Sequence, residues 1–187
     1  HPVDRRQRQM CIRDSFTETA VKVLHSKGIK VFMSNDFIST PMISLATKQL
    51  NASVGIVITA SHNPPSYNGY KLKGNYGGPL TSEKIQEVEN LIPDQISIQL
   101  DLIDLNLAIE SGNVQIVDFE QMYIDAVETA FDLDAIRNAG LHFAYDAMYG
   151  AGQNVLKRLL PEMTFLHCDF NPSFMGQAPE PIEKNLN

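Results

Sequence analysis

Four side chains that can carry out phosphoryl or proton chemistry occur in one short segment of the sequence. Ser61, His62 and Asn63 are consecutive, and Lys71 follows them closely. A serine hydroxyl can act as a nucleophile or carry a phosphoryl group, while an imidazole or an amine can move a proton or neutralise charge. An ordinary turn is the alternative interpretation, because serine, asparagine, proline and glycine are common in loops. Composition alone favours the turn.

The elements before these residues predict where they lie. The apolar run Val54–Ile58 predicts a strand that is covered on both faces, and Ile29–Met33 predicts an earlier strand. Between them, Thr40 followed by Pro41 predicts a helix with Thr40 as its N-cap. Strand, helix and strand in one sheet predict a right-handed parallel crossover. Because ligands bind outside the carboxyl ends of strands in open α/β sheets, we expect Ser61 at such an edge.

Periodicity and cap signals predict that helices and strands alternate through the rest of the chain. The predicted elements are helices over 16–27, 81–92, 102–111, 119–131, 134–139 and 154–160, and strands over 114–117, 141–145 and 164–168. Thr81 and Asp118 are the predicted caps of two of these helices. The glycine-rich run 73–80 predicts a turn, since no Gly-Lys-Ser/Thr follows it to make a nucleotide-binding loop.

Other titratable residues have structural interpretations. Asp146 follows a predicted strand and precedes glycines, so it could be catalytic or bind phosphate, although a role in shaping the turn is favoured. His25, His142 and His167 fall within predicted elements, and we interpret them as structural.

The serine segment closely resembles the phosphoserine loop of the α-D-phosphohexomutases, the phosphoglucomutase and phosphomannomutase superfamily. The matching strings are Thr59-Ala60-Ser61-His62-Asn63-Pro64 and Tyr67-Asn68-Gly69-Tyr70-Lys71. The segments 39–42 and 145–153 fit the same family, and the resemblance extends over nearly all of 16–187. It implies a protein of four domains around one cleft, in which the first three are related α/β domains.

This resemblance implies an α/β fold with a mixed, mostly parallel sheet and helices on both faces. Residues 16–116 are expected to form the first domain, incomplete at its N-terminus, and 117–187 the start of a second related domain. Residues 1–15 are basic, aperiodic and lack an initiator methionine, and they resemble translated sequencing-adapter sequence. We interpret them as a non-native tail; an arm that binds nucleic acid is the alternative. The chain is expected to be truncated at both ends, with domains III and IV missing.

The family interconverts hexose 1-phosphate and hexose 6-phosphate, expected here for glucose or mannose. Hexose 1,6-bisphosphate is its intermediate and activator. The resemblance implies that Ser61 carries the phosphoryl group, that His62 and Lys71 are catalytic beside it, and that Asn63 and Lys71 bind phosphate. It also implies Mg²⁺, bound partly through a phosphoryl oxygen on Ser61.

Several parts of the family pattern are absent from this sequence. The Asp-x-Asp-x-Asp-Arg metal loop, the sugar-recognition loop and the phosphate-clamping last domain do not occur in it. We therefore expect the isolated chain to be inactive. A non-catalytic phosphate- or phosphosugar-binding module is one alternative function, and a phosphoglucosamine mutase is another.

Composition excludes several other classes of protein. The chain is 43% hydrophobic and 20% charged, which is typical of a globular protein, and its formal net charge of −7 argues against nucleic acid as a partner. No apolar run approaches the roughly 18 residues of a membrane span, so no membrane association is expected. Cys11 and Cys168 make no metal-binding or redox pattern, which favours a reducing compartment and a cytoplasmic location.

Overall fold

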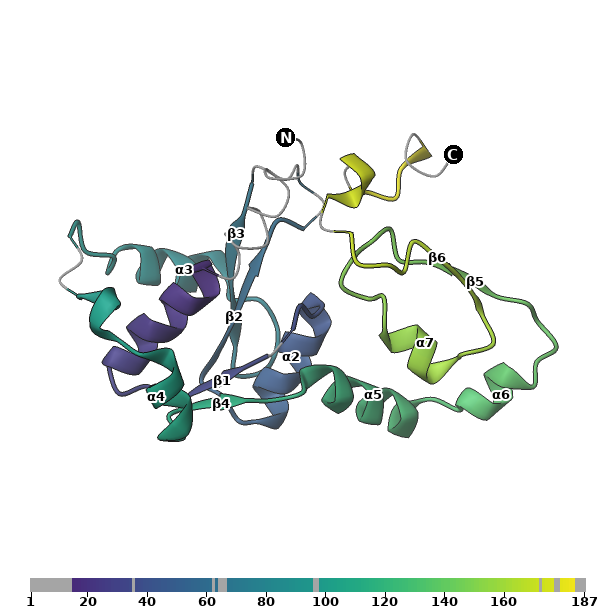
Figure 1. Cartoon of the computed structure of the whole chain (residues 1–187), viewed down its shortest axis with the longest axis horizontal. Helices are drawn as coiled ribbons and strands as arrows, with labels where there is room; N and C mark the ends of the chain where they lie inside the picture. Colours follow the sequence, from purple (N-terminus) through teal and green to yellow (C-terminus); the bar gives the residue numbers. More distant parts are fainter. Residues whose placement is uncertain are drawn as a thin grey trace.

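The computed structural model describes residues 15–34, 36–61, 63, 67–95, 98–171, 173–176 and 179–183 (Figure 1). Most of the predicted tail therefore lies outside the described residues. The described elements are a helix over 15–26, β1 (Val31–Met33), α2 (Thr40–Gln49), β2 (Val54–Thr59), β3 (Gly69–Gly74), α3 (Ser82–Glu89), the 3₁₀ helix η1 (Leu100–Leu102), α4 (Leu105–Glu110), β4 (Val114–Ile116), α5 (Phe119–Ala130), α6 (Leu133–Arg137), β5 (Ala144–Asp146), α7 (Val155–Leu159), β6 (Thr164–Leu166) and η2 (Phe174–Gly176).

The described strands form two parallel pairs and one antiparallel pair. β1 lies parallel to β4, with Val31 opposite Val114, and β5 lies parallel to β6. β2 and β3 are antiparallel partners. Helices flank strands β1 to β4 on both sides, with the helix 15–26 on one side and α2 on the other (Figure 1). The predicted α/β fold with mixed, mostly parallel strands is confirmed.

The predicted pairing of the first two strands is wrong. Among the described residues, β1 pairs with β4 and β2 pairs with β3, so no direct parallel crossover joins β1 to β2. The missing element in the prediction was β3, whose sequence Gly-Tyr-Lys-Leu-Lys-Gly reads as part of a polar loop. Since β3 follows β2 after a short connection, an antiparallel hairpin is the topology that such a connection permits.

Helix starts follow the cap signals closely. Thr81 Oγ1 accepts a hydrogen bond from Lys84 N at 3.4 Å, and Asp118 Oδ1 accepts one from Gln121 N at 2.8 Å, which confirms both predicted caps. The start of α2 is one residue earlier than predicted: Ser39 is its N-cap, without a side-chain cap bond, and Thr40 is already helical. Pro41 remains in the first turn, where its missing N–H has no intrahelical partner to lose.

Two apolar cores hold these elements together. The first joins the helix 15–26, α4 and β4 through Val21, Ala108 and Val114. The second is centred on Met42 of α2, which is 1% exposed and packs with residues of α5, α6 and α7. α2 therefore contacts both the β2–β3 hairpin and the helices α5, α6 and α7, and it connects these two parts of the chain.

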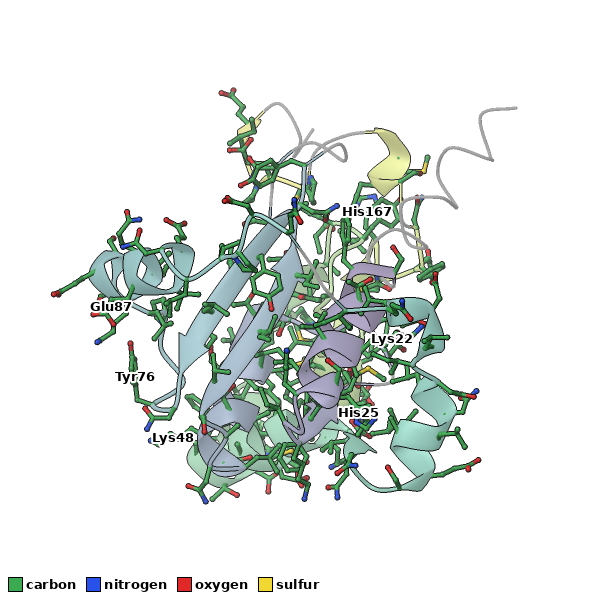
Figure 2. All side chains as sticks on the ribbon, turned by 90° about the vertical axis from the view of Figure 1, so that its left-hand side faces the viewer. Lys22, His25, Lys48, Tyr76, Glu87 and His167 are labelled. Atoms are coloured by element: carbon green, nitrogen blue, oxygen red, sulfur yellow. The ribbon has the colours of Figure 1, made fainter. Side chains whose placement is uncertain are left out.

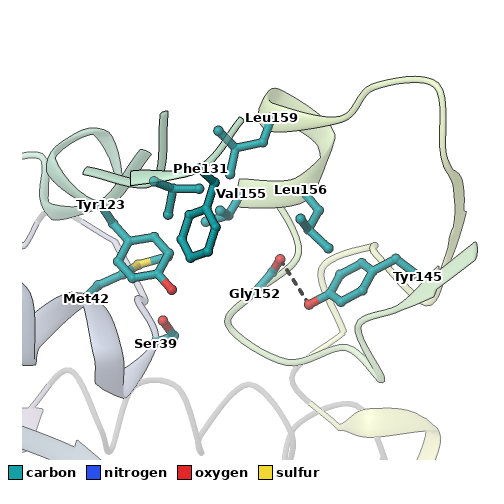
Figure 3. Close-up of a pocket in the computed structure, with 10 residues that line it drawn as sticks. Ser39, Met42, Tyr123, Phe131, Tyr145, Gly152, Val155, Leu156 and Leu159 are labelled. Atoms are coloured by element: carbon teal, nitrogen blue, oxygen red, sulfur yellow. Dashed lines mark hydrogen bonds between the residues drawn. The ribbon is translucent and has the colours of Figure 1, made fainter. Parts of the chain in front are cut away.

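An apolar cavity of about 400 Å³ lies beside this second core, between α2, α5 and α7. Figure 3 shows Tyr123 and Tyr145 at opposite ends of the space, with Phe131 and Val155 between them. Its lining contains no carboxylate, histidine or lysine, and Ser61 is not part of it. We therefore interpret this cavity as a gap in the packing of α2 against α5 and α7, and not as a binding site. None of the described helices has the length and apolar content that a membrane crossing requires.

Candidate active site

Ser61 lies in the connection between β2 and β3, where the strands separate. The hairpin's last pair is Thr59 opposite Gly69, so Ser61 follows the carboxyl end of β2 directly. Its backbone N–H donates to Thr59 Oγ1 at 2.9 Å, and Asn63 N donates to the carbonyl of Ala60 at 3.0 Å. Ala60 is buried while Ser61 is exposed. A buried anchor and two local hydrogen bonds thus fix the turn that presents Ser61 to solvent.

The backbone of Ser61 is in a sparsely populated conformation. Its φ of +54° lies in the left-handed region, which residues other than glycine seldom adopt. Such conformations cost about 1–3 kcal/mol and persist where the surroundings impose them, often at functional sites. The Thr59 hydroxyl, which accepts a hydrogen bond from the N–H of Ser61, is one contact that supports this conformation.

The other predicted site residues lie on or near the same hairpin. Asn63 is half-buried in the turn after Ser61, and Lys71 is exposed on β3, opposite Val57. Lys71 lies two residues beyond Gly69, about 7 Å along the strand at the usual rise per residue. It therefore shares a sheet face with the residue that closes the loop. His62 lies outside the described residues. Ser61 and Asn63 thus lie in the β2–β3 connection, and Lys71 lies within β3, two residue pairs from its loop end.

A second group of polar side chains lies at the carboxyl ends of β5 and β6. His167 Nδ1 is 2.9 Å from both carboxylate oxygens of Asp146, and Asp146 Oδ1 also accepts a hydrogen bond from Met148 N at 2.8 Å. The favoured structural role of Asp146 is therefore confirmed, but its contact with His167 was not predicted. The two residues come from adjacent parallel strands, and sequence patterns carry no signal for such a pair.

The electrostatics of Asp146 favour its ionised form. Burial acts to raise the pKa of this carboxyl group, but the hydrogen bonds from Met148 N–H and His167, together with the imidazole charge, outweigh burial and hold the pKa below its ordinary value. The pKa of Asp146 is lower in the folded state than in the unfolded state, where an aspartate has a pKa of about 3.9. Ionised Asp146 therefore stabilises the fold at pH values above the unfolded pKa. This contribution is lost as the pH falls through the lower, folded value.

The stability difference between the wild-type chain and Asp146→Asn should therefore depend on pH. We expect the wild type to be more stable above about pH 4, and the difference to vanish at lower pH as Asp146 becomes protonated. Urea denaturation from pH 2 to pH 6 measures it. Asp169→Asn is the matched control, because Asp169 is exposed and has no hydrogen bond or ion pair with any described residue. A constant difference across this range would contradict the assignment.

A polar hollow of about 150 Å³ also contains carboxylates, lined in part by Asp36, Asp118 and Glu120. All three are engaged within the fold. Asp118 caps α5, Glu120 accepts from Arg158 at 2.9 Å, and Asp36 accepts from Phe37 N at 2.7 Å. No group of three or more His, Cys, Asp or Glu side chains among the described residues is arranged to hold a metal ion. We do not assign a ligand to this hollow.

Comparison with known protein families assigns most of the chain to one family. The family described as phosphoglucomutase/phosphomannomutase, alpha/beta/alpha domain I, matches residues 12–98. The corresponding domain II matches residues 121–187. The chain belongs to the α-D-phosphohexomutase superfamily. The exposed serine at the carboxyl end of β2 therefore lies within the family's first α/β domain.

Individual relatives carry several enzyme names within this superfamily. The chain is 31% identical to a phosphoglucomutase of Staphylococcus haemolyticus, over 92% of its own length and 33% of the relative's. It is 36% identical to a phosphoglucomutase/phosphomannomutase of Thermococcus kodakarensis, over 79% and 32%. It is 31% identical to a phosphoglucosamine mutase of Bacillus pumilus, over 79% and 31%.

A solved structure shows the same fold. The crystal structure of a Thermus thermophilus protein, provisionally named a phosphomannomutase, superposes with a TM-score of 0.73 at 32% identity. The match covers 85% of this chain and 35% of that one. The chain therefore spans about a third of the length of the phosphohexomutases that it matches.

Proposed function

We propose that this chain is part of a phosphosugar mutase that interconverts the 1-phosphate and 6-phosphate of glucose or mannose, with Ser61 as its phosphoryl carrier. The observation that carries the proposal is the placement of Ser61. It is an exposed serine directly after the carboxyl end of β2, its N–H is bonded to Thr59 Oγ1, and its φ of +54° is in a strained region that is often found at functional sites.

In the proposed reaction, phosphorylated Ser61 gives its phosphoryl group to the free hydroxyl of the sugar monophosphate. The bond between phosphorus and Ser61 Oγ breaks, a bond to the sugar oxygen forms, and the proton of the sugar hydroxyl leaves to a base. The product is hexose 1,6-bisphosphate. Ser61 then recovers a phosphoryl group from the other end of the sugar, and its own hydroxyl loses a proton in that step.

Positioning and charge neutralisation are the main requirements of such a transfer. We assign these tasks to the neighbours of Ser61: Lys71 as a cation for the phosphate and a proton carrier, His62 as a second catalytic group, and Asn63 as a phosphate-binding residue. Lys71 is exposed on the strand that leaves the loop, so its long side chain is available to a ligand there. Asn63 lies in the turn that begins at Ala60.

Magnesium is part of the proposal, but the described residues fit it only incompletely. A hard divalent cation needs about six oxygen ligands, and these residues contain no group of acidic side chains arranged for one. In the proposal, the phosphoryl oxygen on Ser61 is a ligand from this chain, and other ligands come from elsewhere in a longer polypeptide. We derive no step of the reaction through the metal.

An activity assay tests the proposal. We expect a polypeptide of the length of the relatives, containing this chain, to convert glucose 1-phosphate or mannose 1-phosphate to the 6-phosphate when primed with hexose 1,6-bisphosphate. The 187-residue chain alone should show no turnover, because it spans about a third of such enzymes. Turnover by the isolated chain would contradict the proposal that catalysis needs further parts of a longer polypeptide. A long polypeptide that binds these sugar phosphates without converting them would indicate a non-catalytic module.

Phosphoglucosamine mutase is a second candidate function, since relatives with that name match at similar identity. Both activities use the same proposed phosphoserine chemistry, so Ser61 does not separate them. A substrate panel does: preference for glucosamine 1-phosphate over glucose 1-phosphate by the long polypeptide would replace the first assignment with the second.

A further inference from the structure

Two side chains contact the ring of His167, and the loop after β5 also forms a hydrogen bond with its backbone. Its Nδ1 contacts both carboxylate oxygens of Asp146 at 2.9 Å, its ring lies 4.9 Å from the ring of Tyr149, and its carbonyl accepts from Tyr149 N at 2.9 Å. The side chain is nevertheless 51% exposed. A histidine fixed this firmly and left open to solvent is unusual for a residue whose role is packing alone.

The backbone around this pair departs from common conformations. Met148, Tyr149 and His167 have φ values of +47°, +58° and +48°, in the region that residues other than glycine rarely occupy. These residues belong to the segments that leave β5 and β6 at their carboxyl ends, where ligands bind in α/β sheets. Strained backbone at such an edge is typical of a functional site.

The chemistry of the pair defines what it can bind. Because ionised Asp146 occupies Nδ1, that nitrogen carries a proton, and Nε2 has no hydrogen bond with any described residue. In the imidazolium form, Nε2–H is a charged donor without an acceptor in the described part of the chain. Such a donor suits an anion with strong acceptor oxygens.

We propose that Asp146 and His167 form a binding site for a phosphate monoester, in which His167 Nε2–H donates to a phosphate oxygen and Asp146 positions the ring. Identifying the ligand as a sugar phosphate rests on the proposed function, whereas the site itself does not. His167 lies toward the end of the molecule to which the β2–β3 hairpin extends (Figure 2). A phosphate held by His167 would therefore lie on the side of the serine loop.

Binding at this site depends on pH in a defined direction. The anion needs the protonated ring, so its affinity should fall at high pH, where the imidazole is neutral. The titratable or charged groups around the ring are Asp146 after β5, Tyr149 in the following loop, Cys168 and Asp169 next in sequence, and Lys157 of α7, whose Nζ donates to the carbonyl of Cys168 at 2.8 Å. Lys157 uses one of its three ammonium donors in this bond, and His167 Nε2–H is the donor that we assign to the ligand.

Proton NMR of the histidine rings tests the proposal directly. The 187-residue chain and the longer polypeptide are titrated from pH 5 to pH 8 with inorganic phosphate, with glucose 6-phosphate, or with sodium chloride at matched ionic strength. We expect both phosphate ligands to move the His167 titration midpoint upward by about 0.5 pH unit, as a nearby anion does for an imidazole. His142, exposed at the opposite end of β5, should not respond and is the internal control.

Variants separate the two residues' roles. Asp146→Ala should reduce the phosphate response severalfold, because the ring loses the side chain that orients it. In the longer polypeptide, His167→Gln should raise KM for the sugar phosphate about 10-fold, the usual effect of losing one charged hydrogen bond, and leave the phosphate content of Ser61 unchanged. His142→Gln should change neither quantity.

The outcomes separate a failure of the phosphate site from a failure of the proposed mutase function. No response of His167 to either phosphate ligand, or the same response to chloride, overturns the site even if the long polypeptide is an active mutase. A response to inorganic phosphate alone overturns the assignment to a phosphate monoester. A response to both ligands in a polypeptide without mutase activity supports the site and contradicts the proposed function.

Discussion

Ser61→Ala in the long polypeptide is expected to lower mutase activity by at least about 10³-fold, the scale of loss when a covalent nucleophile is removed. Without the hydroxyl, no phosphoryl group can be stored between the two transfers, and the other residues of the loop cannot replace it. The measurement is turnover of glucose 1-phosphate in the presence of hexose 1,6-bisphosphate. Ser61 is exposed, and its backbone N–H, which donates to Thr59 Oγ1, is kept in the variant.

Ser66→Ala is the matched control for this experiment, because it removes a hydroxyl from the same sequence segment. It should retain nearly full activity. Loss of activity in Ser66→Ala together with retention in Ser61→Ala would show that the phosphoryl carrier has been assigned to the wrong serine. Equal retention in both variants would contradict a covalent role for either.

Gly55→Ala is expected to destabilise the chain by about 3 kcal/mol, the upper part of the range for overpacking a buried site. Gly55 is buried in β2, directly against α2. A Cβ at this position would overlap Thr47 Oγ1 and lie 3.2 Å from both Ile43 Cγ2 and Lys73 Cβ. Thr47 cannot easily move away, since it is 4% exposed and its hydroxyl donates to the carbonyl of Ile43 at 2.7 Å.

A double-mutant cycle with Thr47→Ala isolates this overlap. Removing the Thr47 hydroxyl opens the space, so the double variant should recover about 1–2 kcal/mol relative to the sum of the single changes. Urea denaturation of the 187-residue chain measures all four proteins. Gly112→Ala is the control for backbone effects: Gly112 has φ +78° and open space around it, so it should cost only about 1 kcal/mol of strain. Additive energies in the cycle would show that the overlap is not the cause.

Local signals in the sequence predicted local structure well. Asp118 and Thr81 begin helices where predicted, because an N-cap satisfies its hydrogen bond within three residues of itself. The strands at Val54 and Val114 were found because strands are rich in β-branched residues. The predicted cover on both faces of the first was wrong, since Gly55 and Val57 are buried while Val54 is 41% exposed. The serine loop was found from its unusual residue order, and its placement after the carboxyl end of β2 agrees with that prediction.

Contacts between distant segments could not be predicted in this way. β1 pairs with β4, which is far along the chain, and neither segment carries a sequence signal that identifies the strand with which it pairs. β3 was not predicted as a strand because Lys71 and Lys73 give its sequence a polar composition. An exposed strand nevertheless tolerates lysine. The contact between Asp146 and His167 depends on the parallel pairing of β5 and β6, so no sequence pattern indicated that the two residues meet. A structural role was favoured for Asp146 over a catalytic or phosphate-binding one, and His167 was interpreted as structural.

The most direct test of the central claim is the position of phosphate in the purified long polypeptide. Intact-mass and peptide mass spectrometry should find about one phosphoryl group per molecule, on the peptide that contains Ser61, and it should disappear on incubation with a sugar monophosphate. The phosphoryl group adds between about one and two negative charges at neutral pH, so native charge-shift electrophoresis provides a second readout. A protein active as a mutase with its phosphoryl group on any other residue would contradict the assignment of Ser61.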